Sequence, residues 1–183
     1  MNYFLAILAG LVQGLTEFLP ISSTGHLIIF EKLFNVSQET FGLTFDASLH
    51  LGTLLAVLIF FSKDYLKVFD LKNNLWLKLI VGTTPAVIAG LFFQKAVESQ
   101  LRSFTVIGLS LIVFSCVMVL AEIAGSKNKD GQKVSGKKAF LIGLAQALAL
   151  IPGISRSGST ISAGLFLGLT RQESARFAFM LSG

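Results

Sequence analysis

The chain is poor in charged residues, in cysteine and in proline, and each shortage argues against a class of protein. Only 14% of its 183 residues are charged, whereas a soluble globular domain carries about a quarter. A single cysteine rules out a disulfide framework or a thiolate metal site. No lysine or arginine precedes Lys32, so the first apolar run lacks the basic region of a signal peptide. We therefore expect mature structure from the first residues onward.

Long apolar runs take the place of charge. Hydrophobic residues make up 53% of the chain, and the mean hydropathy is +0.74. The net charge is +5, and the basic residues lie in short stretches between the apolar runs. This pattern is typical of loops at a lipid headgroup surface, so no nucleic-acid partner is expected. The pattern predicts an all-α, polytopic helix bundle in a membrane. The runs cover 3–19, 27–34, 41–61, 79–93, 104–123, 139–151, 159–169 and 177–183.

Three runs are long enough to cross a bilayer, and the others are not. A crossing helix needs about 20 apolar residues, which 41–61 and 104–123 supply, and 79–93 reaches if Trp76 and Leu77 extend it. Lysine-rich segments at 62–78 and 124–138 are expected to be cytoplasmic.

The short runs then predict two re-entrant helical hairpins. Residues 3–34 enter from outside and turn at 20–26, and residues 139–169 enter from the cytoplasm and turn at 152–158.

A repeat with an offset of 133 residues supports this arrangement. The offset places Gln13 on Gln146 and Ser22 on Ser155, among other matches. With opposite entry directions, the matches predict an inverted-topology repeat, whose broken helices usually meet at a functional site. We expect a single membrane domain over 1–183, divided into a first repeat at about 1–123, a cytoplasmic loop at 124–138 and the start of a second repeat at 139–183. The other matches are Gly10 with Gly143, Leu11 with Leu144, Leu15 with Leu148, Ile21 with Ile154, Gly25 with Gly158 and, conservatively, Thr24 with Ser157.

The first hairpin contains the sequence QGLTEFLPISSTGH at residues 13–26. Gln13 and Glu17 lie four apart, on one face of a helix, and a carboxylate inside a membrane segment marks a functional site by default. Their oxygens suit a hard divalent cation, Mg²⁺ or Ca²⁺. The alternative is that Glu17 only pairs with Arg156 to hold the hairpins together.

Hydroxyl groups and a histidine follow in the same motif. Ser22, Ser23 and Thr24, at the start of a helix, predict a cradle for an anion such as phosphate. His26 is then suited to proton transfer near neutral pH. Taken alone, the histidine would be read as a packing or interfacial residue.

The second hairpin contains PGISRSGST at residues 152–160. Arg156, flanked by Ser155, Ser157 and Thr160, predicts a bidentate phosphate clamp. The alternative is an arginine in a cytoplasmic surface loop. Asp46 and His50, four apart in 41–61, are interpreted as an ion pair rather than as support for the site.

These two motifs resemble those of the undecaprenyl pyrophosphate phosphatase family of the bacitracin-resistance type, and the resemblance runs from Met1 to Gly183. It implies hydrolysis of undecaprenyl pyrophosphate to undecaprenyl phosphate and orthophosphate, which recycles the carrier lipid for cell-wall synthesis and confers bacitracin resistance. Many members have Glu where this chain has Gln13. Family roles carried over are metal and pyrophosphate binding for Gln13 and Glu17, nucleophilic or proton-transfer work for Ser22, Ser23 and His26, and phosphate clamping for Ser155, Arg156 and Thr160.

Family members are usually longer and have further helices. We therefore expect residues 1–183 to be an incomplete chain that is inactive by itself. The nucleophile, Ser23 or water, and the oligomeric state, with a homodimer among the options, stay open. The rival function is a transporter or flippase for an anionic or phosphorylated lipid, because paired broken helices are also transporter architecture.

Overall fold

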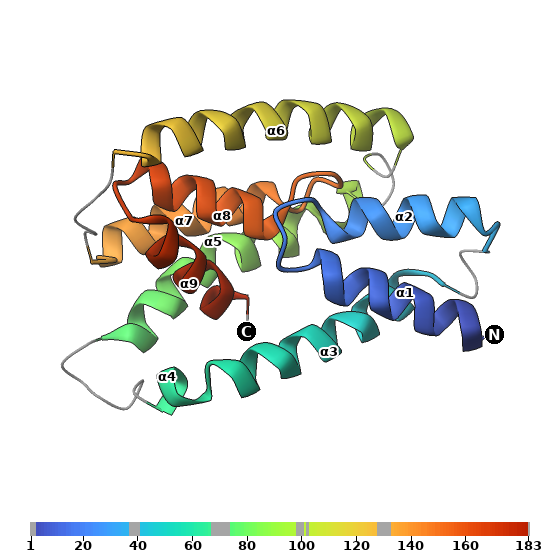
Figure 1. Ribbon diagram of the computed structural model, residues 1–183, viewed down its shortest axis with the longest axis horizontal. Coiled ribbons are helices and arrows are strands. Elements are labelled where there is room, and N and C mark those ends of the chain that lie inside the picture. The colour runs from blue at the N-terminus through green and yellow to red at the C-terminus, as the bar shows by residue number, and fades with distance from the viewer. Residues whose placement is uncertain are drawn as a thin grey trace.

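The protein is helical throughout the part of the chain that the computed structural model describes, which is residues 3–36, 41–66, 74–97, 101, 103–127 and 133–182 (Figure 1). The prediction of an all-α fold is therefore confirmed. The helices are α1 (Tyr3–Thr16), α2 (Ser23–Leu33), α3 (Leu43–Phe60), α4 (Ser62–Leu66), α5 (Leu75–Ala96), α6 (Phe104–Gly125), α7 (Gly136–Leu148), α8 (Arg156–Phe166) and α9 (Arg171–Leu181).

The three long apolar runs form α3, α5 and α6. Helix α6 begins where predicted, because Ser103 caps it by accepting a hydrogen bond from the Val106 backbone N–H at 3.2 Å. The segment 62–78, expected to be a loop, is partly helical instead, since it contains α4 and the first turn of α5. The remaining basic positions of that segment, like parts of the 94–103 and 124–138 loops, lie outside the described residues.

The long helices present their apolar side chains outward. Within the described residues, Leu75–Phe93 and Phe104–Gly125 are long and apolar enough to cross a membrane, yet only 11% and 17% of these spans are buried inside the molecule. A core helix of a soluble protein would be mostly buried. Leucines and phenylalanines on α3 are exposed as well, up to 81% for Phe60. Such surfaces require lipid as their solvent, so the protein is embedded in a membrane.

Two helical hairpins have matching bounds. Helix α1 packs on α2, and α7 packs on α8. Subtracting the repeat offset of 133 from the ends of α8, at 156 and 166, gives 23 and 33, which are the ends of α2. The turns cover 17–22 and 149–155, slightly earlier than the predicted 20–26 and 152–158. The reason is that Ser22 and Ser155 are N-caps, which starts the second helix of each hairpin sooner.

The second hairpin is fixed by close backbone contacts. A Cβ at Gly143 of α7 would lie 2.1 Å from the Gly82 carbonyl oxygen of α5, so this crossing requires glycine. Gly153, in the turn after α7, has a φ of 97°, and a Cβ there would lie 2.7 Å from the Ile107 carbonyl oxygen of α6. Helix α8 then runs between α6 and α9 (Figure 1). These contacts hold the tip of the second hairpin beside the tip of the first.

Candidate active site

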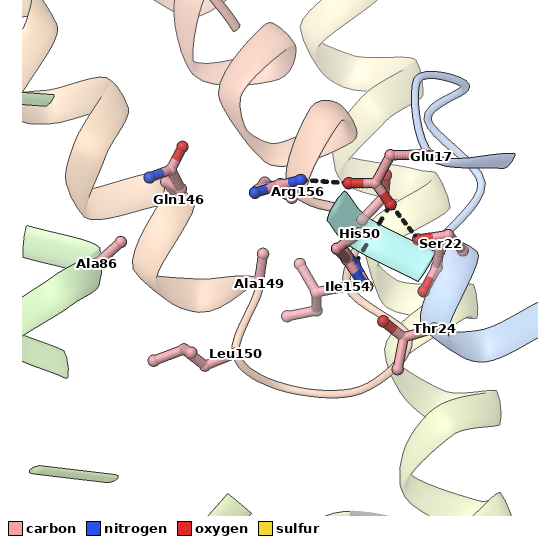
Figure 2. A pocket seen from close by; sticks show the side chains of 12 residues that line it. Glu17, Ser22, Thr24, His50, Ala86, Gln146, Ala149, Leu150, Ile154 and Arg156 are labelled. Carbon is pink, nitrogen blue, oxygen red and sulfur yellow. Dashed lines mark hydrogen bonds and ion pairs between the residues drawn. The ribbon is translucent and has the colours of Figure 1, made fainter. Parts of the chain in front are cut away.

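The tips of the two hairpins enclose a cavity of about 270 Å³. Figure 2 shows polar side chains from both tips on one part of its wall and small or aliphatic side chains on another. Its lining combines a carboxylate, a guanidinium, an imidazole and several hydroxyl groups. The lining residues are Glu17, Ser22, Ser23, Thr24, His50, Ala86, Gln146, Ala149, Leu150, Ile154, Ser155 and Arg156.

Glu17 lies just after α1 and is only 7% exposed. Its Oε2 accepts hydrogen bonds from Gln13 Nε2 at 2.8 Å and from Ser23 Oγ at 2.6 Å, and its Oε1 pairs with the guanidinium of Arg156. His50 Nε2 lies 3.6 Å from the same Oε2. A buried carboxylate needs such compensation, and here it comes from three separate segments of the chain.

Arg156 is the first residue of α8 and connects the two hairpins. Its side chain is 38% exposed, whereas that of Glu17 is 5% exposed. Because a guanidinium has five N–H donors, one ion pair leaves donors for a ligand in the cavity. A second link between the hairpins is the hydrogen bond from Ser157 Oγ to the Leu19 carbonyl oxygen, at 3.1 Å. The pairing of Glu17 with Arg156, which the sequence left as the alternative to a metal-binding role, is therefore present.

Two helix N-termini face the cavity. Ser22 Oγ accepts from the Gly25 N–H at 3.3 Å at the start of α2, and Ser155 Oγ accepts from the Gly158 N–H at 3.1 Å at the start of α8. Helix N-termini carry partial positive charge and attract anions. Ser22 has a φ of 65°, unusual for a residue other than glycine, and strained backbone of this kind clusters at functional sites.

The structure brings six of the ten predicted site residues to the cavity wall. The other four support that wall from behind or beside it. His26 Nδ1 lies 2.8 Å from the Ser22 carbonyl oxygen, so its ring is fixed against the strained residue. Thr160 Oγ1 donates to the Arg156 carbonyl oxygen at 2.8 Å. The six are Glu17, Ser22, Ser23, Thr24, Ser155 and Arg156, and the four are Gln13, His26, Ser157 and Thr160.

Comparison with known proteins identifies the family. Residues 6–183 match the family model described as bacitracin resistance protein BacA, and both hairpins lie inside that match. The chain belongs to the BacA family.

Curated relatives of this BacA-family protein include three that carry the name undecaprenyl-diphosphatase. The protein from Thermodesulfovibrio yellowstonii is 46% identical over 179 residues, which cover 98% of this chain and 69% of that protein. The one from Rubrobacter xylanophilus is 42% identical, with 97% and 70% covered. The one from Mycobacterium tuberculosis strain H37Ra is 41% identical, with 100% and 70% covered.

Two further residues of this BacA-family site were not predicted. His50 was interpreted as pairing with Asp46, but the structure places its ring in the cavity wall beside Glu17, with Nδ1 2.8 Å from the Asp46 backbone carbonyl oxygen. Gln146 is 7% exposed and also lines the cavity. His50 could have been found from the polar pair that it forms with Asp46 in an apolar helix. Gln146 could have been found from its match with Gln13 in the repeat.

The residues present fit a divalent cation only if its ligand set is completed from outside the protein. The described residues contain no group of three or more His, Cys, Asp and Glu side chains suited to a metal. They do offer the Glu17 carboxylate and Gln13 Oε1, which is buried and has no hydrogen-bond partner in the described part of the chain. Mg²⁺ is commonly bound by one or two carboxylates together with substrate phosphates and water. The donor set therefore fits a hard cation that arrives with a phosphate ligand.

Proposed function

We propose that this protein hydrolyses undecaprenyl pyrophosphate to undecaprenyl phosphate and orthophosphate, which recycles the carrier lipid for cell-wall synthesis and confers bacitracin resistance. The observation that carries the proposal is the cavity itself, where Arg156, two helix N-termini and Glu17 converge inside a membrane-embedded BacA-family protein. The curated relatives named undecaprenyl-diphosphatase support the same reaction.

The cavity suits phosphoryl transfer because its groups are fixed before the substrate arrives. Arg156 would contact the oxygens of the terminal phosphoryl group, assisted by hydroxyl groups from Ser22, Thr24 and Ser155. Positioning and charge stabilisation provide most of the catalysis in such reactions. The ion pair with Glu17 holds the guanidinium in place and the hydrogen bond from Thr160 anchors its backbone, so little reorganisation is needed.

Glu17 is the group in contact with the candidate nucleophile. Because the Ser23 hydroxyl donates to Glu17 Oε2 at 2.6 Å, the carboxylate is placed to take the proton from Ser23, or from a water at the same position. The nucleophile attacks the terminal phosphorus, the bond to the bridging oxygen breaks, and undecaprenyl phosphate leaves. If the nucleophile is water, orthophosphate forms in this step. If it is Ser23, a phosphoserine forms, and a water then hydrolyses it to orthophosphate and restores the hydroxyl group. His26, held at the Ser22 carbonyl oxygen, positions the first turn of α2.

A divalent cation, Mg²⁺ or Ca²⁺, belongs to this proposal. Glu17 and Gln13 would hold it, and it would neutralise charge on the pyrophosphate oxygens. The two side chains already lie together, with Gln13 Nε2 donating to Glu17 at 2.8 Å. Binding the cation would require the amide to turn its Oε1 toward the carboxylate.

The membrane arrangement we propose is two re-entrant hairpins that enter from opposite faces of the inner membrane, as halves of an inverted repeat. The coincident bounds of α2 and α8 after the 133-residue offset support it. A cysteine at Lys127, in the lysine-rich segment after α6, should react with a membrane-impermeant reagent only after the inner membrane is opened. A cysteine at Gln100, in the 94–103 loop, should react in intact cells with a permeable outer membrane. Reversed labelling would contradict the proposed orientation.

The test of the function is phosphate release from undecaprenyl pyrophosphate by the purified full-length gene product in detergent. We expect orthophosphate and undecaprenyl phosphate in equal amounts, and dependence on added Mg²⁺ or Ca²⁺. Detergent removes the second compartment, so a transporter or flippase for the same lipid would release nothing. If correctly folded protein releases no phosphate, the proposal is refuted.

A further inference from the structure

A second, apolar pocket of about 290 Å³ lies next to the first hairpin. Phe18, the residue after Glu17, forms one wall, the inner half of α3 forms another, and Phe179 of α9 forms a third. Almost all of the surface that these side chains expose in the pocket is carbon. The lining residues are Phe18, Ala56, Val57, Phe60, Phe61 and Phe179.

A smaller cavity of about 180 Å³ lies between this pocket and the polar site and shares wall residues with both. It shares His50 and Arg156 with the polar cavity, and it shares Phe18 with the apolar pocket. The three spaces follow one another along α3, from His50 through Leu54 to Phe61. At about 1.5 Å per residue, that path is about 16 Å long. Its character changes along the way from charged to entirely apolar.

The walls of the apolar pocket are held by specific contacts. The rings of Phe18 and Phe179 meet edge to face, with centroids 5.6 Å apart. Val57 and Phe61 are buried against Met180 of α9. The Tyr65 hydroxyl donates to the Met180 carbonyl oxygen at 2.8 Å, which ties α9 to α4 at the inner end of α3 (Figure 1).

We propose that this apolar pocket binds the isoprene units of the substrate that lie next to its pyrophosphate, and so makes the enzyme select diphosphates with a long polyprenyl tail. The inference rests on the proposed function and names a second subsite of the same substrate. The occupant follows from continuity, since one molecule must carry its charge at Arg156 and hydrocarbon beyond Phe18. A polyprenyl diphosphate has that order of groups, and burial of its apolar surface favours binding.

The direction of the path agrees with the orientation proposed above. Helix α3 starts outside and ends inside, so His50 lies nearer the outer surface than Phe61 does. A lipid whose headgroup is at the outer surface extends its tail toward the bilayer centre, along the same direction. The tail units nearest the headgroup would then pass Phe18 before they reach Val57.

The experiment compares two water-soluble allylic diphosphates that differ in tail length, farnesyl diphosphate and dimethylallyl diphosphate, with the full-length gene product in detergent. Ala56→Leu narrows the apolar pocket, and Ala47→Leu makes the same change at an exposed alanine of α3 that lines none of the three cavities. We expect Ala56→Leu to lower kcat/KM for farnesyl diphosphate about tenfold, since small steric changes in an apolar pocket have effects of this size. Its activity on dimethylallyl diphosphate and both activities of Ala47→Leu should stay unchanged.

A second variant keeps the test possible if Ala56→Leu folds poorly. Val57→Ala removes contacts from the same pocket without overfilling it, and it should also lower the preference for farnesyl over dimethylallyl diphosphate. If unaltered protein hydrolyses both substrates and neither variant changes the preference relative to Ala47→Leu, the tail subsite is wrong and the phosphatase assignment stands. If unaltered protein releases no phosphate from undecaprenyl pyrophosphate or from either short substrate, the proposed function itself has failed.

Discussion

The two hairpins share the bounds and the N-caps of their second helices but carry different chemistry. After the 133-residue offset, Ser22 falls on Ser155, and both cap the helix that follows. The charged residues do not match each other in this way. Glu17 of the first hairpin falls on Leu150 of the second, and Arg156 of the second falls on Ser23 of the first.

This difference teaches that the repeat sets where the two helix N-termini lie, and that single residues which differ between the halves supply the charged groups of the site. Each half contributes one capped helix N-terminus to the cavity. The carboxylate comes only from the first half and the guanidinium only from the second. The backbone also differs where the chemistry does. Ser22 is strained, with a φ of 65°, and Ser155 is relaxed, with a φ of −76°. The base and the candidate nucleophile both lie on the strained side.

The largest effect is expected from the second hairpin's contribution. Arg156→Ala removes the main charge stabilisation of the transferring phosphoryl group and should lower kcat at least ~10²-fold. Phosphate release from undecaprenyl pyrophosphate measures it. Arg156→Lys keeps the charge but not the bidentate fork, so we expect an intermediate loss. Retention of more than about half of normal activity by Arg156→Ala would refute the clamp assignment.

A comparable loss is expected for Glu17→Ala, together with a changed requirement for the divalent cation. The matched control is the double variant Glu17→Leu/Arg156→Met. Replacing both members of a buried ion pair by apolar residues often preserves stability, whereas removing one costs about 3–5 kcal/mol. If the pair only holds the hairpins together, the double variant will recover activity along with its thermal stability. We expect it to recover stability alone.

The sequence predicts the helices well because their signals are local. Apolar run length set α3, α5 and α6, and the two serine-rich motifs located both hairpin turns within a few residues. The turns end earlier than predicted, since N-capping by Ser22 and Ser155 places Ser23 and Arg156 inside helices. Capping geometry depends on backbone angles, which a motif does not specify.

The site was predicted where its residues share a motif and missed where they come from other segments. The Glu17–Arg156 pair followed from two polar motifs in apolar surroundings. His50 reaches Glu17 only because α3 packs on α1, a tertiary contact with no trace in spacing along the chain. The proton-transfer role of His26 stays a prediction, and the contact that the structure gives its ring, with the Ser22 carbonyl oxygen, is local, between residues four apart.

Two matched glycines test whether the two hairpins pack in the same way, and the expected change in stability is of intermediate size. Gly10 and Gly143 match in the repeat, but a Cβ at Gly143 would meet the Gly82 carbonyl oxygen at 2.1 Å, whereas a Cβ at Gly10 meets only Leu49 Cδ2, at 3.8 Å. Gly143→Ala should therefore destabilise the protein by about 1–3 kcal/mol. Gly10→Ala should be neutral or stabilising by up to about 1 kcal/mol, from helix propensity. Thermal unfolding in one detergent compares them, and equal shifts would mean that the two hairpins pack alike.

The smallest expected effect concerns the matched glutamines, Gln13 and Gln146. The Oε1 of each is buried without a hydrogen-bond partner among the residues that the structure describes. Gln13 nevertheless donates to Glu17, whereas Gln146 has Leu150 where the first hairpin has its carboxylate.

Gln146→Leu should accordingly lower kcat/KM for undecaprenyl pyrophosphate about tenfold, equivalent to about 1.4 kcal/mol, while the melting temperature stays level or rises. The stability follows because replacing an unsatisfied buried polar group by an apolar one is neutral or favourable. The activity falls because the Gln146 amide is then lost from the cavity wall as a polar contact for the phosphate or for a water that it brings in. Gln13→Leu is the control, and it should lower both quantities, since it removes a hydrogen bond to Glu17. If Gln146→Leu keeps kcat/KM within about twofold of normal, Gln146 only lines the cavity. The second hairpin would then act through Arg156 and its neighbouring hydroxyl groups.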